Sequence, residues 1–506
     1  MSAQPIPLSE ATGAGAALER ALILATCTAV TFLYAMTVTI ANVSLPQMQG
    51  ALSASPDQIA WVVTANIVAT AVVTPLAGWL TSRFGRRLLC NGCVLGFGVA
   101  SLGCGLADSL AELVMFRVLQ GAIGAPLVPL SQAIVLDTYA KRHHGAAIAL
   151  FGVGSVLGPV VGPVLGGYLA EAYNWRWVFY MVVPFAALAL LGSLAFIHDR
   201  ETGSRLRLDW LGFVLLSAAL ASVQLMLDRG ELADWFDSAE IVAWATLAGV
   251  ALYAFVAHSA TTERPFLDPR LLADRNFAIG VVLVFVFGML NITPMTLLPP
   301  MLQGVSGYPD SVIGFVLGAR GLGTMTGFFL MIFASRLDPR AMIVLGFLLQ
   351  AVAGWQLAHL DVNPRTADVF WPLALQGLGV GVLWVPITMV SFSTLGSEHV
   401  SEGSAVFHMV RNIGSSVHIS LSVALAVHMT RTGYAELAER VTPYSASSSM
   451  PWVTGAWSME DLRGLAGVSR EMARQATMLG YLDAFVFFIA TALATLPLVL
   501  LIRVKR

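Results

Sequence analysis

Long apolar segments separated by short polar loops run along almost the whole chain. Most of them have about the twenty residues that an α-helix needs to cross the hydrocarbon core of a bilayer. They do not show the period-two alternation of outer-membrane barrel strands. The segments lie at 21–43, 58–80, 88–107, 110–136, 145–170, 176–197, 209–228, 238–258, 277–301, 311–334, 340–360, 368–392, 405–430 and 480–502. This pattern predicts an all-α integral membrane protein with fourteen transmembrane helices.

Composition supports a lipid environment and argues against several partners. The chain is 57% hydrophobic and 11% charged, whereas soluble domains are about 25% charged. The net charge of −2 gives no support for a nucleic-acid partner. The C-x-x-C pair Cys90 and Cys93 lies in an apolar segment without His or acidic neighbours, so we interpret it as buried apolar packing. We expect no metal and no cofactor.

The basic residues of the loops predict the orientation, because Lys and Arg accumulate on the cytoplasmic side. Seventeen of them fall in the segments that share a side with the N-terminus. The six short loops on the other side carry only Arg176, Arg229 and Arg365. We therefore expect a multi-pass protein of the bacterial inner membrane with both termini in the cytoplasm. The tail 1–20 would be cytoplasmic and the long loop 431–478 periplasmic.

An internal repeat divides the chain. Leu119-Gln120-Gly121 followed by Val128-Pro129 returns as Leu375-Gln376-Gly377 followed by Val385-Pro386. Two weaker matches occur in the same order, and each joins one helix to the helix eight further on. The simplest account is a six-helix half at 21–200, two inserted helices at 201–265 and a second six-helix half at 266–506. Parallel repeats of this kind are typical of carriers with a site between the halves.

The fifth predicted helix is rich in glycine and proline. Glycines four residues apart let a neighbouring helix approach closely, and prolines remove backbone hydrogen bonds. The residues are Gly154, Gly158, Pro159, Gly162, Pro163 and Gly166. We favour a contact that moves during transport over static packing.

The loop after the second helix combines a tight turn with three arginines. Its candidate conformational residues are Gly78, Arg83, Gly85, Arg86 and Arg87. The arginines fit a topology signal, and they also fit a latch that breaks during transport. For the latch we hypothesise a pair between Arg83 and Asp137.

Polar residues inside the apolar segments are the candidates for a transport cavity. A charge within the bilayer is costly and must face a partner or a cavity, which applies to Arg117, Arg320 and Arg411. Arg117 and Gln120 are one helical turn apart and share a face. His408 and His418 can titrate near neutral pH or remain neutral and buried. The predicted cavity residues are Asn42, Arg117, Gln120, Asn291, Trp384, His408 and Arg411.

Several motifs resemble the major facilitator superfamily, and within it the fourteen-helix drug:proton antiporters of EmrB/QacA type. They are 39-TIANVSLP-46, the loop 78–87, 117-RVLQG-121, the glycine-proline helix and 175-WRWVFY-180. The segment 227-LDRG-230 resembles the EmrB branch in particular. The resemblance spans essentially the whole chain. It implies efflux of hydrophobic drugs or metabolites in exchange for protons, by alternating access. It also implies a periplasmic adaptor and an outer-membrane channel as possible partners.

Two departures from that family bear on the mechanism. The family usually carries an acid in the first helix where Thr37 stands, and another where Ser82 stands. Proton coupling would then use an acid near a helix end, a histidine or the substrate itself. The acids near helix ends are Glu112, Asp137, Asp228 and Asp483.

Four other functions are alternatives. An uncoupled facilitator or a dedicated metabolite exporter would use the same fold. A membrane enzyme would need a catalytic constellation, and the one basic-histidine cluster, at 141–144, has no such spacing. An ion channel would need rings of like charge or a carbonyl filter. We therefore expect a transporter and not an enzyme.

Overall fold

A computed structural model describes residues 14–198, 208–263, 265–268, 270–334, 337–396, 399–441, 457 and 462–502. All regular structure in these ranges is helical. Fourteen helical segments are long and apolar enough to cross a membrane. The prediction of an all-α membrane protein with fourteen spans is thus confirmed.

The N-terminal half comprises six spans, several of which are interrupted by short 3-10 turns or breaks. They are α1 (Ala14–Val43), α3 (Pro56–Val73) continued by η1 (Thr74–Leu76) and α4 (Ala77–Phe84), α5 (Arg86–Leu106), α6 (Leu110–Gly124) with α7 (Leu127–Thr138), α8 (His144–Ala172), and α9 (Trp177–Tyr180) with α10 (Val182–Phe196). A short helix, α2 (Leu45–Ala51), follows α1 outside the span.

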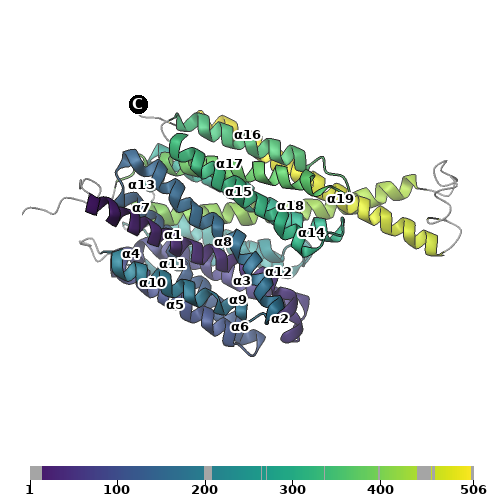
Figure 1. The fold of residues 1–506 in the computed structure, drawn as a ribbon, viewed down its shortest axis with the longest axis horizontal. Helices are drawn as coiled ribbons and strands as arrows, with labels where there is room; N and C mark the ends of the chain where they lie inside the picture. The colour runs from purple at the N-terminus through teal and green to yellow at the C-terminus, as the bar shows by residue number, and fades with distance from the viewer. Residues whose placement is uncertain are drawn as a thin grey trace, which may run out of the picture.

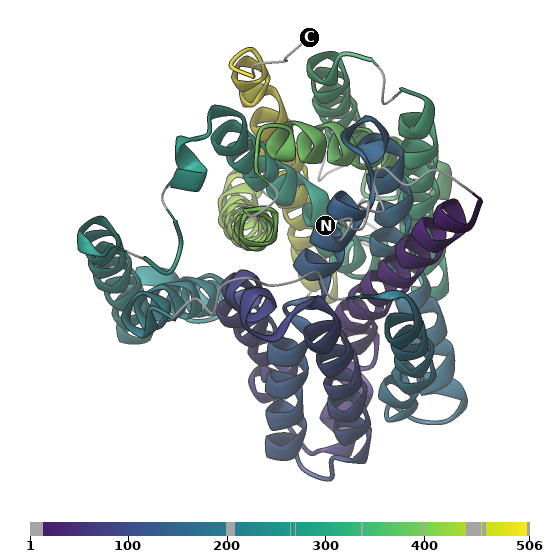
Figure 2. The same ribbon diagram turned by 90° about the vertical axis from the view of Figure 1, so that its left-hand side faces the viewer.

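The C-terminal half repeats this arrangement after two inserted helices. The inserted pair is α11 (Trp210–Arg229) and α12 (Ala239–Thr261), and the half itself comprises α13 (Arg270–Ala273), α14 (Arg275–Gly304), α15 (Asp310–Ala334), α16 (Pro339–Leu357), α17 (Thr366–Phe392), α18 (Val400–Arg440), α19 (Leu462–Ala494) and α20 (Leu496–Val499). The inserted pair lies at the edge of the bundle (Figure 2), where α11 packs against α3 and α18. It therefore contacts both halves.

Local sequence signals set several helix ends. Ser55 and Gln58 form a reciprocal capping box at the start of α3. The side chains of Asp209 and Asp274 accept backbone hydrogen bonds at the starts of α11 and α14. Gly85, with φ of +80°, separates α4 from α5 in a conformation that favours glycine. These caps and breaks explain why the loops between spans are short.

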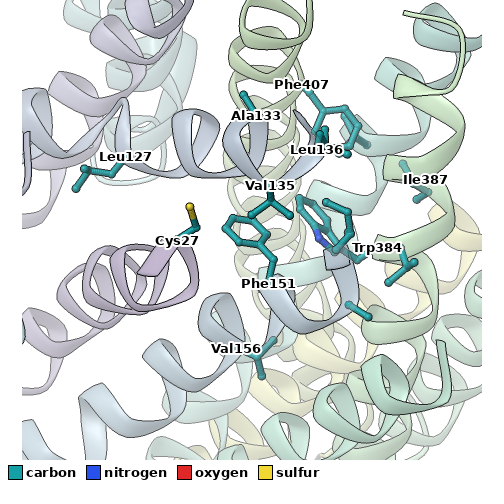
Figure 3. Packing of buried hydrophobic residues seen from close by; sticks show 14 of the residues in the cluster. Cys27, Leu127, Ala133, Val135, Leu136, Phe151, Val156, Trp384, Ile387 and Phe407 are labelled. Carbon is teal, nitrogen blue, oxygen red and sulfur yellow. The ribbon is translucent and has the colours of Figure 1, made fainter. Parts of the chain in front are cut away.

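Apolar packing is continuous from one half to the other. Val135 on α7 and Phe151 on α8 lie beside Trp384 on α17 and Phe407 on α18 (Figure 3). The side chains of Val135, Phe151 and Phe407 have no exposed surface, and 4% of Trp384 is exposed. The contact between the halves is therefore a dry, well-packed interface at this level of the bundle.

The structure corrects the expected long loop at 431–478. Helix α18 continues to Arg440 and α19 begins at Leu462, so much of this segment is a helical hairpin that projects beyond the bundle (Figure 1). Tyr434 and Ser469 join the two arms through a hydroxyl hydrogen bond of 3.0 Å. The prediction was wrong because it followed hydropathy, and these polar turns stay helical outside the apolar run. Residues 442–456 and 458–461 lie outside the described ranges.

The N-terminal boundary also differs. Helix α1 begins at Ala14, within the tail predicted for 1–20, and residues 1–13 are not described. Both ends of the described chain lie on the side opposite the hairpin (Figure 1). We call the side with Ala14 and Ile502 the terminal face.

Candidate functional site

The two halves meet near the terminal face through polar contacts between α7 and α18. The Ser404 hydroxyl donates to the carbonyl of Pro129 at 3.0 Å. The imidazole Nε2 of His408 is hydrogen-bonded to Oε1 of Gln132. His408 and Gln132 are almost fully buried, yet His408 Nδ1 and Gln132 Nε2 have no hydrogen-bond partner among the described residues. The interface is closed here by few bonds and carries unused polar groups.

Further contacts close the same side. Lys141, after α7, donates to the carbonyl of Ser393 after α17 at 3.1 Å. Gly152 on α8 lies so close to Phe328 on α15 that a β carbon would meet the ring at 2.5 Å. Only a residue without a side chain permits this approach. The contact between the halves is therefore made by hydrogen bonds at α7 and by close packing against a glycine at α8.

Arg117 and Gln120 lie together, as the spacing predicts, but their hydrogen bonds join helices within the N-terminal half. The Arg117 guanidinium is 1% exposed; it donates from Nε to the carbonyl of Val62 at 2.9 Å and from Nη1 to Gln120 at 2.6 Å. Gln120 donates in turn to Ser101 on α5 at 2.7 Å. The Asn66 amide closes the ring by donating to the Arg117 carbonyl at 2.9 Å. This cluster ties α3, α5 and α6 to one another.

Arg320 and Asn291 form a corresponding cluster in the C-terminal half. Arg320 on α15 donates from Nε to Gln376 on α17 at 2.8 Å and from Nη2 to the Asn291 carbonyl on α14 at 2.7 Å. It also donates to the side chain of Asn291 and lies 3.0 Å from the Met295 sulfur. Gln376 donates to the carbonyl of Leu290 at 3.2 Å. Arg320 is therefore bonded at all three guanidinium nitrogens.

Arg411 has a different environment from the other two arginines. Its side chain is partly exposed, and its guanidinium donates only to the neighbouring Asn412, at 3.0 and 3.4 Å, within the described part of the chain. The guanidinium carbon lies 5.6 Å from the ring centre of Trp384. Trp384 packs on His408 at a ring distance of 5.8 Å. The structure thus gathers three of the predicted cavity residues, Trp384, His408 and Arg411.

Tyr34 on α1 belongs to the same region, and the sequence analysis missed it. Its phenol lies within electrostatic range of both Arg117 and Arg411, and its ring packs on Phe97. Its position one helical turn before Thr37 was the available signal, because both residues share a face of α1. The side chain of Asn42, another predicted cavity residue, lies outside the described part of the chain. The roles of the predicted residues in transport stay predictions.

The latch loop has a different ion pair from the one we hypothesised. Arg86, at the start of α5, pairs with Asp137 near the end of α7, whereas Arg83 is exposed on α4. Gly85 breaks the helix between the two arginines and places them on different elements. Gly78 lies directly against the backbone of Glu402, where a β carbon would approach to 2.9 Å. The loop therefore contacts the C-terminal half through glycine.

The glycine-proline helix packs mainly within its own half. Gly154, Gly158 and Gly166 on α8 face α1. A β carbon on Gly158 would lie 2.6 Å from the backbone nitrogen of Met36. Pro159 is half-buried, Gly162 is buried, and the side chain of Pro163 is outside the described residues. The close contact of α8 and α1 is present in this conformation, and its movement stays a prediction.

Thr37, at the position of the missing acid, is hydrogen-bonded within its own helix. Thr37 is 2% exposed and its hydroxyl donates to the carbonyl of Leu33 in its own helix at 2.8 Å. His418, the second histidine of α18, is held by Thr293 at 2.8 Å and stacks on Phe487. His418 is thus a core residue of the C-terminal half.

Comparison with known proteins identifies the family. The family model described as Major Facilitator Superfamily matches residues 27–418. The chain belongs to the major facilitator superfamily. Members of this superfamily are transporters and not enzymes, which agrees with the expectation from the sequence. The resemblance to this superfamily is therefore confirmed.

Relatives within the superfamily are export and resistance proteins. The chain is 32% identical over 421 residues to "Multidrug export protein EmrB" of Escherichia coli (strain K12), covering 83% of this chain and 82% of that protein. It is 31% identical over 420 residues to "Fatty acid resistance protein FarB" of Neisseria gonorrhoeae, covering 82% of each. The solved structure of the proton:xylose symporter XylE matches with a TM-score of 0.60 at 13% identity, covering 94% of this chain and 95% of that one. The last match concerns the fold alone.

Proposed function

We propose that this protein is a secondary active multidrug efflux transporter that exports hydrophobic small molecules in exchange for protons by alternating access. It would act in the bacterial inner membrane with both termini in the cytoplasm. The observation that carries the proposal is the interface near the terminal face. Its polar contacts are single hydrogen bonds, such as that from Ser404 to Pro129, and each contributes only about 1 kcal/mol. Bonds of that strength can break and re-form in every transport cycle.

The energetics permit export against a gradient. One charge that crosses a potential of 100 mV releases about 2.3 kcal/mol. Concentrating a neutral solute tenfold costs about 1.4 kcal/mol. One proton per cycle would therefore sustain a gradient between tenfold and a hundredfold.

The projecting hairpin of α18 and α19 supports the partnership with a periplasmic adaptor and an outer-membrane channel. With both termini in the cytoplasm, the hairpin extends into the periplasm, where such an adaptor would dock. Arg474 anchors the second arm at its base by donating to the Val305 carbonyl at 2.6 Å. The relative from Escherichia coli is named a multidrug export protein, which agrees with small hydrophobic molecules as substrates.

The test is proton movement in proteoliposomes with an imposed pH gradient and a dye that reports lumenal pH. Neutral hydrophobic compounds are added one at a time, with protein-free vesicles and an ionophore as controls. Substrate-dependent proton movement that needs the protein supports the antiporter. Substrate flux with no proton movement overturns the proton coupling.

One observation favours a second candidate, an uncoupled facilitator. The Thr37 hydroxyl donates a hydrogen bond to a backbone carbonyl of its own helix, so the first helix has no titratable group at the position of the family's acid. Thr37→Asp would place an acid there. If proton movement appears only in that variant, the facilitator is the better account of the natural chain.

A further inference from the structure

The three arginines inside the spans differ in which groups accept their hydrogen bonds. A guanidinium carries five N–H donors. Arg117 and Arg320 direct theirs to buried oxygens of neighbouring helices. Within the described part of the chain, the Arg411 guanidinium donates only to the side-chain oxygen of Asn412, the next residue in its helix. Arg411 is therefore the arginine that no hydrogen bond to another helix holds among the described residues, and its Nη1 donors are unused there.

Nothing in the described part of the chain neutralises Arg411. No Asp or Glu described by the structure lies within ion-pair distance of its guanidinium. An unpaired charge within a membrane bundle is costly and is stable only when it faces a cavity, water or a partner ion. The Arg411 guanidinium lies over the ring of Trp384 on α17 and interacts electrostatically with Tyr34 on α1, in the other half of the protein. Its missing partner would therefore arrive through the transport pathway.

The surroundings of Arg411 add a second unused donor and an apolar wall. Trp384 is 4% exposed, and its indole nitrogen, which can only donate, has no hydrogen-bond partner among the described residues. The Trp384 ring packs on Phe287 at 5.3 Å and on Phe407 at 5.8 Å. Donors without acceptors beside an aromatic surface suit a molecule with an anionic head and an apolar body.

We propose that Arg411 binds the anionic head group of an amphipathic substrate, with Trp384 as its aromatic neighbour and second donor. The inference rests on the proposed export function and names its substrate class. It has an energetic consequence for a chain that lacks the usual acid at Thr37. An anion that leaves a negatively charged cytoplasm is driven outward by the membrane potential, by about fiftyfold in concentration per 100 mV. Such export needs no proton carried by the protein.

Binding to the purified full-length chain in lipid nanodiscs tests the proposal. Three probes with the same eight-carbon body are compared by calorimetry against empty nanodiscs: octanesulfonate, octan-1-ol and octyltrimethylammonium. Octanesulfonate is permanently charged, so protonation of the probe plays no part. We expect it to bind at least tenfold more tightly than the other two. Equal affinity for the three head groups would overturn the proposal.

The variant Arg411→Gln separates the charge from the shape of the site. We expect it to lose tenfold to a hundredfold in octanesulfonate affinity while octan-1-ol affinity changes less than threefold. Arg411→Lys keeps the charge and is expected to recover part of the loss. Arg142→Gln, in an exposed loop at the terminal face, is the matched control and should bind as the natural chain does. Unchanged octanesulfonate affinity in a folded Arg411→Gln protein contradicts the assignment.

Flux measurements distinguish failure of this inference from failure of the export function. In proteoliposomes with a potassium diffusion potential and no pH gradient, we expect octanesulfonate efflux that is lost in Arg411→Gln. Preferential binding without flux of any compound would contradict the export function and leave the anion site intact. Flux of neutral compounds without preference for the sulfonate would contradict the anion site and leave the export function intact.

Discussion

In each half, the glutamine of the repeated Leu-Gln-Gly motif is hydrogen-bonded to a buried arginine, but the arginine lies on a different helix of the repeat in each half. In the N-terminal half, Arg117 and its Gln120 lie on one helix. In the C-terminal half, Arg320 lies on α15 and reaches across to Gln376 on α17. The difference shows that the repeat preserves the polar cluster and not the position of its charge.

The glycine after each glutamine explains why the clusters correspond. A β carbon on Gly121 would collide with the carbonyl oxygen of Asn66, and one on Gly377 would collide with the carbonyl oxygen of Arg320. Asn66 and Arg320 therefore occupy equivalent positions on α3 and α15. In both halves the two helices therefore approach backbone to backbone at the same point. The space beside this contact holds the guanidinium of Arg117 in the N-terminal half and of Arg320 in the C-terminal half.

The largest effect is expected for Arg320→Met. It leaves acceptors on Gln376 and Asn291 without their charged donor, and we expect a loss of about 3 kcal/mol in the free energy of unfolding. Arg117→Met removes two bonds instead and should cost about 2 kcal/mol. Unfolding in a denaturing detergent, followed by circular dichroism, measures both. Equal losses would mean that the link to α14 adds nothing.

A smaller effect is expected when the glutamines are removed. Gln376→Leu breaks bonds to Arg320 and to the carbonyl of Leu290, on two other helices, and should cost about 2 kcal/mol. Gln120→Leu breaks bonds to Arg117 on its own helix and to Ser101 on α5, and it should cost closer to 1 kcal/mol because only one of these bonds joins two helices. The same unfolding assay compares them. A larger loss for Gln120→Leu would reverse the ranking of the two clusters.

The bond between the halves should matter less to stability than the clusters within them. Ser404→Ala removes the hydrogen bond to Pro129 and is expected to cost about 1 kcal/mol or less. Its transport rate should change, because the barrier to opening the interface falls. A rate equal to that of the natural chain at unchanged stability would show that this bond has no part in opening.

The smallest effect on stability is expected for Arg411→Gln. Its guanidinium bonds only to Asn412 in the described part of the chain, so the free energy of unfolding should change by less than about 0.5 kcal/mol. A loss comparable to that of Arg320→Met would place Arg411 among the structural arginines and remove the basis for an anion site.

Much of the fold was predictable because hydropathy is a strong local signal. The predicted span 368–392 compares with Thr366–Phe392 for α17, and 110–136 covers α6 and all but the last two residues of α7. The helical hairpin formed by the end of α18 and the start of α19, within 431–478, was missed because its polar helical turns carry no hydropathy signal. Membrane spans are thus readable from the sequence, and helical extensions into water are not.

The site was predictable only in part. Arg117 and Gln120 share a helix face, and the spacing alone predicts their contact. The bond of Arg320 to Gln376 and that of His408 to Gln132 join residues far apart in the sequence, which no local pattern reveals. For the same reason, the sequence alone did not distinguish Arg117 and Arg320, which are hydrogen-bonded to neighbouring helices, from Arg411.

Alternating access is tested most directly by a distance across the terminal face. Spin labels at Lys141→Cys and Ser393→Cys, with the four buried native cysteines replaced by alanine, would be measured by electron–electron double resonance in nanodiscs. A label pair within one half serves as the control. The account predicts a short distance without substrate and a second, longer population when a transported compound is present. A distance distribution that never changes with substrate, while flux continues, would contradict it.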